Sequence, residues 1–399
     1  MPTRHRTSLC REGWYLLLLL AVVLTWALLR ENNLLLLVAG LMAAMLLINW
    51  RLSVAALRRL EVRRCAVSNA HAGSWLTIEL EVANTRRRLG SWALSVEDSV
   101  KRQDDQRDMQ PVRPSVMFPY LPAGQSMRQS YRVCLPQRGR YALGPLRVST
   151  RFPFGLVQRA LWHPGDDQLL VLPRLGRLRP AWLQHYQPAP HGTRGARRPG
   201  YVPGDFFAVR EWQAGDSVRW VHWRSTARHR ELVVRQFEQP GERELGVLLD
   251  LWEPDEPQPD QRQRVELAVS FAATLVVEFC CSNRGQLLLA TASARPVCLE
   301  KPASVAMSRE ALEALALAQA SSIAPLSALR NAAFSRARPQ FDMVLISTRE
   351  RAGAELEDLL AAAGSAAPGA RRRLVHLAAS DSTLADYFED DRRLAEAPP

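Results

Sequence analysis

Two long apolar segments near the N-terminus constrain the fold of this chain more than any other feature. Residues 14–29 and 34–48 are almost entirely apolar, and only the four residues 30–33 separate them. Each segment is at the short end of the ~17–25 residues that a membrane-spanning helix needs, and Trp50 extends the second into the membrane interface. So short a polar connection predicts a transmembrane helical hairpin over residues 14–50.

A secretory signal peptide is the main alternative for the first segment, because Arg4, Arg6 and Arg11 form a basic region before it. No small-residue cleavage site follows, and a second apolar segment comes at once. We therefore expect an uncleaved anchor preceded by a short N-terminal segment, residues 1–13.

The orientation of the hairpin follows from the arginines that flank it. Arginines precede the first segment and follow the second, whereas the connection holds one Arg and one Glu. The flanking arginines are Arg4, Arg6, Arg11, Arg51, Arg58, Arg59, Arg63 and Arg64. Because positively charged flanks stay inside, we expect a multi-pass protein of the inner (plasma) membrane with both termini and the soluble domains in the cytoplasm.

Composition sets further limits on the soluble part. About 350 residues remain outside the membrane, enough for roughly two domains, and the 47% hydrophobic content allows real cores. The formal net charge is +12, carried almost wholly by arginine. Attraction to anionic headgroups is the simpler use of this charge in an anchored protein, so we expect no nucleic-acid binding. The six cysteines form no CxxC pair, which fits reduced thiols in the cytoplasm.

Residues 54–173 have the pattern of a strand-rich domain. Apolar and polar residues alternate over 76–84 and 129–135, and further candidate strands are 92–98, 141–150 and 168–174. Gly and Pro mark the turns between them. Short strands at this spacing predict a β-sandwich-like domain without a catalytic cluster.

Residues 244–399 alternate between strand and helix patterns. Candidate strands are 244–251, 286–293, 341–348 and 372–378, and candidate helices are 262–283, 308–319, 351–363 and 384–388. This alternation predicts an α/β domain with a mostly parallel, Rossmann-type sheet. Ligand sites in such sheets lie at the carboxyl ends of the strands, which is where Asp250 ends the first one.

A dense Trp, Arg, Asp and His motif occupies residues 200–238 of the linker 174–243. It resembles the signature of the domain-of-unknown-function family 58 (DUF58), with Trp212 and Val221 in place of the usual tyrosine and isoleucine. Residues 138–156 and the two apolar segments also look like this family. The matching residues are Gly204, Asp205, Phe206, Arg210, Glu211, Gly215, Asp216, Arg219, Trp223, Ala227, Arg228, Arg235 and Glu238.

The resemblance implies more about fold and partners. Members of this family are similar to von Willebrand factor A-like domains after the motif. They commonly accompany MoxR-type AAA+ ATPases and membrane transglutaminase-like proteins, and their biochemical activity is not established. The resemblance thus implies a MoxR-type ATPase as a protein partner.

A von Willebrand A-type metal site needs the pattern D-x-S-x-S after the first strand. Here Trp252 and Pro254 stand at the two serine positions after Asp250, and Ser347 and Thr348 stand where a second acidic residue is expected. One carboxylate and two distant hydroxyls make a poor site for Mg²⁺. We expect a degenerate site at Asp250, with no metal and no cofactor.

The motif allows three interpretations. Its charged and aromatic residues can form a structural lock, a docking surface for a partner, or a catalytic centre built on acidic residues and His222. No Walker A loop or GxGxxG motif occurs, and no Ser-His-Asp or Cys-His set follows from spacing. The candidate interaction residues are Asp205, Arg210, Glu211, Gly215, Asp216, Arg219, His222, Trp223 and Arg228.

We therefore predict a membrane-anchored, non-enzymatic interaction or scaffold protein that works with a MoxR-type ATPase in the assembly or maturation of envelope or other complexes. The alternative is a hydrolase that uses the acidic residues of 200–238. We assign no catalytic residue, and the sequence names neither the client nor the oligomeric state.

Overall fold

The computed structural model describes residues 4–65, 69–103, 111–165, 167–182, 198–200, 206–214, 216–239, 244–281, 285–323, 326–331, 342–349, 374–379 and 382–390. The chain divides mainly into two compact units, residues 1–175 (the first unit) and residues 176–390 (the second unit).

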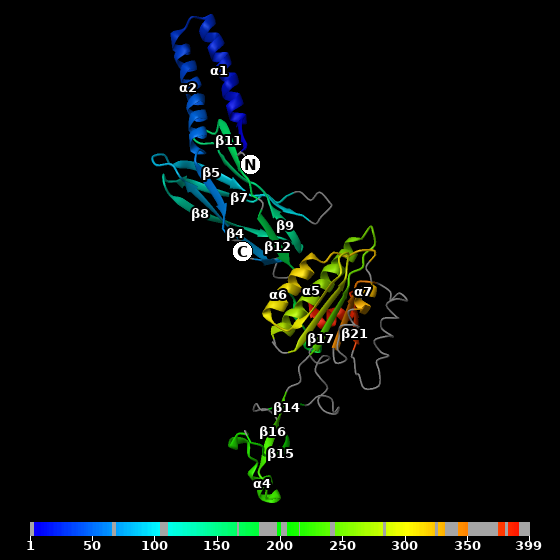
Figure 1. Ribbon diagram of the computed structural model, residues 1–399. Helices are drawn as coiled ribbons and strands as arrows, with labels where there is room; N and C mark the ends of the chain where they lie inside the picture. The colour runs from blue at the N-terminus through cyan, green and yellow to red at the C-terminus, as the bar shows by residue number, and fades with distance from the viewer. Residues whose placement is uncertain are drawn as a thin grey trace. The chain divides into compact units, whose positions relative to one another are not determined.

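The two apolar segments form long helices that run side by side (Figure 1). Helix α1 spans Arg11–Leu29 and helix α2 spans Asn33–Ala56. Both are long and apolar enough to cross a membrane, and only 11% of each apolar stretch is buried within the protein. The Asn32 side chain caps α2 by accepting a hydrogen bond from the Leu34 amide at 3.0 Å. The predicted helical hairpin is therefore present.

The N-terminal segment before the hairpin forms a strand that the sequence did not predict. Strand β1 (Arg4–Leu9) pairs in antiparallel register with β11 (Val157–His163), so that Arg6 lies opposite Ala160. The Cys10 amide continues the ladder by donating to the Leu156 carbonyl at 2.9 Å. Both ends of the hairpin are thus joined to the same unit.

Three sheets make up the rest of the first unit. The first has the order β1-β11-β10-β5-β7, the second β3-β12-β9-β6 and the third β2-β4-β8. The described strands of these sheets pair in antiparallel fashion, except that β3 is parallel to β12. The remaining bounds are β2 Leu60–Arg64, β3 Ala70–His71, β4 Trp75–Asn84, β5 Ser91–Glu97, β6 Val100–Arg102, β7 Ser115–Leu121, β8 Ser126–Cys134, β9 Gly139–Leu143, β10 Leu146–Thr150 and β12 Asp167–Leu172.

One hydrophobic core serves all three sheets. The alternation that predicted β4 places Ile78, Leu80 and Val82 in this core, where they meet inward residues of the other sheets such as Val96 and Leu143. The strand predicted over 141–150 is instead two strands, β9 and β10, because Gly144 and Pro145 break it. Sheets that share one core are what a sandwich-like domain requires.

Polar side chains fasten the C-terminal end of α2 to the first unit. The Arg86 guanidinium donates to the Ala55 carbonyl at 2.5 Å and to the Ala56 carbonyl at 3.2 Å. Helix ends leave such carbonyls without partners inside the helix, so Arg86 acts as a side-chain cap. The buried Asn49 side chain accepts from the Val157 amide at 2.8 Å.

The second unit contains a five-stranded sheet with the order β19-β18-β17-β20-β21. Strands β17, β18, β20 and β21 are parallel and β19 is antiparallel to β18. Their bounds are β17 Glu244–Asp250, β18 Gln286–Ala292, β19 Val297–Pro302, β20 Asp342–Ser347 and β21 Leu374–Ala378. Every residue of β17 is buried, as expected for a central strand covered on both faces.

Helices lie along this sheet, with α5 and α7 on either side of β17 (Figure 1). Leu326 and Leu329 of α7 pack against Leu248, Leu288 and Leu345 of the sheet. Residues 350–373 lie outside the described part of the chain, and the predicted helix 351–363 falls there. The helix bounds are α5 Pro259–Cys281, α6 Val305–Leu317, α7 Leu326–Asn331 and α9 Ser382–Tyr387, and a short ladder joins β13 Arg177–Leu178 to β22 Phe388–Glu389.

The motif region forms a separate three-stranded antiparallel sheet with the order β14-β16-β15. Strand β14 spans Arg198–Gly200, β15 Phe206–Glu211 and β16 Val233–Gln239. The strand pattern at 231–238 and the short connection before the strand at 244–251 predict a hairpin between these two strands. That expectation is wrong: β16 pairs with β14 and β15, whereas β17 pairs with β18 and β20.

Candidate functional site

The motif sheet carries a short helical excursion between β15 and β16. A 3-10 turn, η1 (Val218–Trp220), leads into helix α4 (Trp223–His229), and the chain then returns to β16. Backbone bonds tie the excursion down, because the His222 amide donates to the Val233 carbonyl at 2.8 Å and the Trp212 amide donates to the Leu232 carbonyl at 2.7 Å. Val221, Val233 and Val234 are buried beneath it.

An ion pair between Arg210 and Asp216 closes the loop that follows β15. The Arg210 Nη2 donates to Asp216 Oδ1 at 2.6 Å, and the Gln213 amide donates to Asp216 Oδ2 at 2.9 Å. The Asp216 side chain is only 6% exposed and that of Arg210 is 22% exposed. The hydrogen bond from Arg210, with that from the Gln213 amide, lowers the pKa of the Asp216 carboxyl.

Because Arg219, Arg224 and Arg228 follow Asp216 closely in sequence, the motif predicts that they pair with it, and this prediction is wrong. The ion pair of Asp216 is with Arg210, and the side chains of those three arginines are exposed. The Asp216 amide donates to the Gln213 carbonyl, and the Gln213 amide donates to the Asp216 carboxylate. These two bonds hold Asp216 close to the end of β15. Asp216 therefore pairs with an arginine of the preceding strand, although Arg219 is nearer in sequence.

His222 begins α4 and uses its side chain to cap it. Its Nδ1 accepts from the Ser225 amide at 3.2 Å and lies 2.7 Å from the Ser225 hydroxyl. Because Nδ1 accepts from an amide, we assign the ring proton of the neutral imidazole to Nε2. The main role of this contact is to cap the N-terminus of α4. The spacing of the motif did not single out Ser225 as a partner of His222.

Several large side chains of the motif face solvent. Val218 is 67% exposed, Trp223 64% and Trp212 37%. We call these three residues, with the exposed arginines Arg219, Arg224 and Arg228, the docking residues. Solvent-facing Trp and Arg are the residue types that dominate protein interfaces.

Among the described residues of the motif, the remaining side chains form no catalytic set. Glu211 is exposed, and Asp216 is engaged by Arg210. Asp205 and Gly215 lie outside the described residues. Among the residues that the structure describes, no group of three or more His, Cys, Asp or Glu side chains could hold a metal ion.

Asp250 is the last residue of the central strand β17 and lies beside the carboxyl end of β20. At this point the order of strands in the sheet reverses, since β18 lies on one side of β17 and β20 on the other. Asp250 is fully buried, and its Oδ2 accepts from the Ser347 hydroxyl and from the Arg349 Nε, both at 2.9 Å. Burial raises the pKa of the Asp250 carboxyl, and the Arg349 guanidinium opposes this rise. This is the crevice in which open α/β sheets bind their ligands.

The residues around Asp250 do not fit a divalent cation. The guanidinium of Arg349 lies over the Trp252 ring at 5.7 Å and supplies the positive charge itself. The Thr348 hydroxyl is engaged by the backbone of Trp252 at 2.7 and 2.8 Å. The sequence missed Arg349, although its position directly after the predicted strand 341–348 marked it.

Part of this chain is similar to known proteins. Residues 208–367 match the model of the family described as "Protein of unknown function DUF58". The chain is 27% identical over 141 residues to the "Uncharacterized protein YeaD" of Bacillus subtilis (strain 168), which covers 35% of this chain. The aligned part spans 34% of that relative.

Solved structures offer only distant likenesses. A β-glucosidase from Listeria innocua matches 28% of this chain and 16% of its own at 11% identity and a TM-score of 0.20. Spo0M, a sporulation control protein from Bacillus subtilis, matches 29% of this chain and 50% of its own at 12% identity and a TM-score of 0.17. Scores this low carry no argument about fold or activity.

Proposed function

We propose that this chain, whose residues 208–367 match the model of the DUF58 family of unknown function, is a membrane-anchored, non-enzymatic interaction protein. The proposal rests on one observation: the motif has a largely buried ion pair and, beside it, large side chains that face solvent. Arg210 and Asp216 face inward and hold the loop, whereas Trp212, Val218 and Trp223 face solvent. A lock that supports an exposed Trp–Arg set is how a docking surface is built.

The chemistry of the docking residues selects a kind of partner. The apolar side chains supply contact area, and Arg219, Arg224 and Arg228 add three positive charges. An acidic protein surface with an apolar centre complements this set. A MoxR-type AAA+ ATPase is the partner class that the family resemblance implies, acting with this chain in the assembly or maturation of envelope or other complexes.

The proposal includes the fold and the location. The parallel sheet of the second unit is a von Willebrand factor A-like domain in which Arg349 supplies the positive charge beside Asp250. The hairpin is the anchor in the inner membrane, with both termini and both units on the cytoplasmic side. The pairing of β1 with β11 supports this arrangement, because it requires both ends of the hairpin to lie on one side of the membrane.

A hydrolase centred on the motif is the alternative. The contact between the Ser225 hydroxyl and His222 Nδ1 is the observation in its favour. Against it, Nδ1 also accepts from a backbone amide, and the carboxylate of Asp216 is engaged by Arg210. A hydrolase must lose activity when Ser225 or His222 is replaced by Ala.

Partner capture by the full chain tests the proposal. Trp223→Ala should weaken binding of a purified MoxR-type ATPase by about tenfold and leave the melting temperature unchanged, because exposed interface tryptophans contribute mainly to binding. The matched control is Trp75→Ala, which removes a 50% exposed Trp from β4. Asp216→Ala should lower the melting temperature instead.

Crosslinking in native membranes provides the second measurement. The proposal expects an ATPase of this class among the captured proteins, and its loss in the Trp223→Ala variant. Equal capture by wild type, Trp223→Ala and Trp75→Ala would contradict the docking role. Hydrolysis that disappears with Ser225→Ala, without loss of folding, would favour the enzyme.

A further inference from the structure

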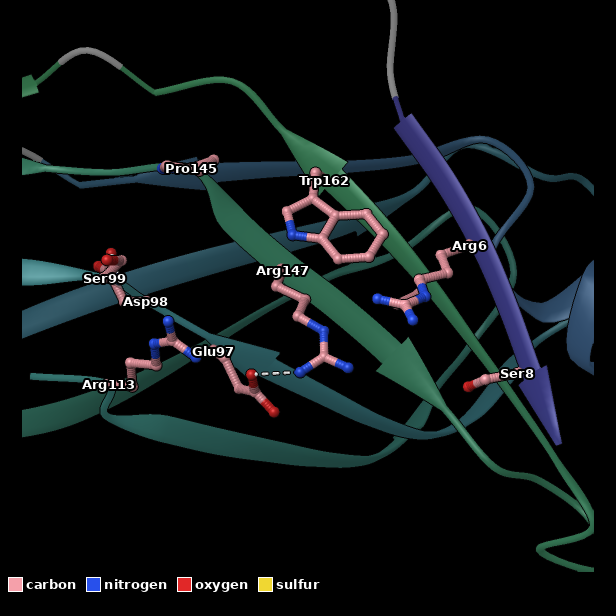
Figure 2. Close-up of a pocket in the computed structure, with 10 residues that line it drawn as sticks. Arg6, Ser8, Glu97, Asp98, Ser99, Arg113, Pro145, Arg147 and Trp162 are labelled. Carbon is pink, nitrogen blue, oxygen red and sulfur yellow. Dashed lines mark hydrogen bonds and ion pairs between the residues drawn. The ribbon is translucent and has the colours of Figure 1, made fainter. Parts of the chain in front are cut away.

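A pocket of about 380 Å³ lies on the first unit, against the sheet β1-β11-β10-β5-β7. Figure 2 shows Arg6 and Ser8 entering it from β1 and Trp162 from β11. A volume of ~300–1,000 Å³ is usual for small-molecule sites, so this pocket has room for a small ligand or one headgroup. Its lining residues are Arg6, Ser8, Glu97, Asp98, Ser99, Arg113, Pro145, Arg147, Ala160 and Trp162.

One of the three arginines in the pocket is already paired. Arg147 Nη1 donates to Glu97 Oε2 at 2.8 Å, and its guanidinium lies 5.7 Å from the centre of the Trp162 ring. Figure 2 shows this pair in the middle of the pocket, with Arg6 and Arg113 on opposite sides of it. Arg147 is thus neutralised and fixed in place.

The other acidic residue of the lining does not neutralise the pocket. Asp98 is buried and accepts two hydrogen bonds from Arg64, at 2.6 and 2.9 Å, and one from the Tyr131 hydroxyl at 2.6 Å. Asp98 is therefore paired with Arg64, which also pairs with Asp167 at 2.8 Å and does not line the pocket.

Two positive charges remain. Within the part of the chain that the structure describes, the guanidinium groups of Arg6 and Arg113 make no hydrogen bond or ion pair. Both side chains are exposed at the pocket. Two arginines without carboxylate partners, held on opposite sides of one hollow, favour a ligand with two negative charges.

We propose that this pocket binds a phosphate group. Arginine forks match the geometry of phosphate oxygens, and the hydroxyls of Ser8 and Ser99 can donate further hydrogen bonds to them. The Trp162 ring forms an apolar wall for the part of the ligand that carries the phosphate. Glu97 opposes the ligand electrostatically and lowers its affinity.

The phosphate has two sources, a small soluble ester or a phospholipid headgroup. Arg6 is five residues before Arg11, which begins α1, so it lies ~17 Å along an extended chain from the helix start, beyond a headgroup layer of ~5–8 Å per leaflet. This distance favours the soluble ester.

Titration of the full chain in phosphatidylcholine nanodiscs with inorganic phosphate tests the proposal by calorimetry. Arg113→Gln and Arg6→Gln should each weaken binding by about tenfold, because each removes a charge-assisted contact. Arg132→Gln is the matched control, since Arg132 is an exposed arginine of β8 outside the pocket. Arg113 carries the cleaner test, because Arg6 also belongs to the charges that orient the hairpin.

Glu97→Gln should increase phosphate binding, and a variant that fails to fold could not give this result. Removing this carboxylate leaves Arg147 uncompensated, so phosphate should bind several-fold more tightly. The second arm measures how much radiolabelled phosphatidylglycerol the detergent-solubilised chain retains, with phosphatidylcholine as reference. Retention that depends on Arg113, without binding of inorganic phosphate, assigns the site to a lipid headgroup.

Phosphate binding by the wild type and the four variants decides the proposal. Saturable binding that falls in the Arg6 and Arg113 variants, holds in Arg132→Gln and rises in Glu97→Gln supports a phosphate site. Absence of binding in both arms overturns it, as does an equal loss in all three arginine variants.

Discussion

At the scale of single residues, two of the carboxylates that sequence analysis singled out in the second unit have arginine partners within the protein. Asp216 pairs with Arg210 in the motif, and Asp250 pairs with Arg349 at the end of the parallel sheet. In both places an arginine fills the role that a ligand or a metal would fill in an active centre. Each pair gives a prediction.

The Asp250–Arg349 pair predicts that the second unit does not depend on a divalent metal. Mg²⁺ at 100-fold over its dissociation constant would add ~2.7 kcal/mol to the free energy of unfolding. Because Arg349 already neutralises Asp250, melting of the full chain with Mg²⁺ and with chelator should give the same midpoint. A clear upward shift with Mg²⁺ would contradict this prediction.

The Arg210–Asp216 pair predicts a specific acid sensitivity. The folded-state pKa of Asp216 is depressed by Arg210 and the Gln213 amide. Its contribution to stability is therefore complete above the ordinary aspartate pKa of about 3.9 and is lost as the pH falls through the lower folded-state value. Melting temperatures of wild type and Asp216→Asn should differ at neutral pH, begin to converge only below about pH 4, and become equal below the depressed folded-state pKa. A constant difference across this range would show that the charge of Asp216 is not what stabilises the loop.

At the scale of secondary-structure elements, the joint between α2 and the first unit depends on Arg86. Burial lowers the pKa of the Arg86 guanidinium, which remains charged and donates to the carbonyls that end α2. Arg86→Ala leaves these carbonyls without this partner and should cost about 2 kcal/mol. Chemical denaturation of the detergent-solubilised chain measures the loss, with the exposed Arg132→Ala as control. Equal stability of the two variants would mean that water replaces Arg86 without cost.

The elements that the sequence predicted well are those with a regular pattern of apolar residues. Strand β4 was predicted at 76–84 and spans Trp75–Asn84, since its alternation reflects one buried and one exposed face. Helix α5 was predicted at 262–283 and spans Pro259–Cys281. Strand β1 escaped prediction because RHRTSL has no apolar face, and its pairing with β11 is settled by partners far along the chain.

The candidate site was less predictable than the fold. Sequence placed Arg210 and Asp216 in one motif but paired Asp216 with the wrong arginines, because spacing does not reveal how the Gln213–Asp216 turn folds back. The pocket around Arg147 was not predicted at all. Its residues come from β1, β5, β10 and β11 and from the segments between strands, and only the sheet order brings them together.

At the scale of the whole molecule, the anchor makes a prediction about topology. The arginines on both sides of the hairpin and the pairing of β1 with β11 require one common side for both hairpin ends. A reporter active only in the periplasm, fused after Pro399, should stay silent, and one that fluoresces in the cytoplasm should be bright. A strong periplasmic signal would overturn the cytoplasmic placement.

The same strand pairing also sets an order of events during synthesis. Strand β1 leaves the ribosome first, but its partner β11 follows only roughly 150 residues later, a delay of ~8–30 s at ~5–20 residues per second. Both apolar segments emerge within that interval. The positively charged N-terminal tail therefore stays without its strand partner until β11 has been made. On the topology proposed above, insertion of the anchor precedes closure of the first sheet, and a nascent chain whose tail had crossed the membrane could not complete that sheet.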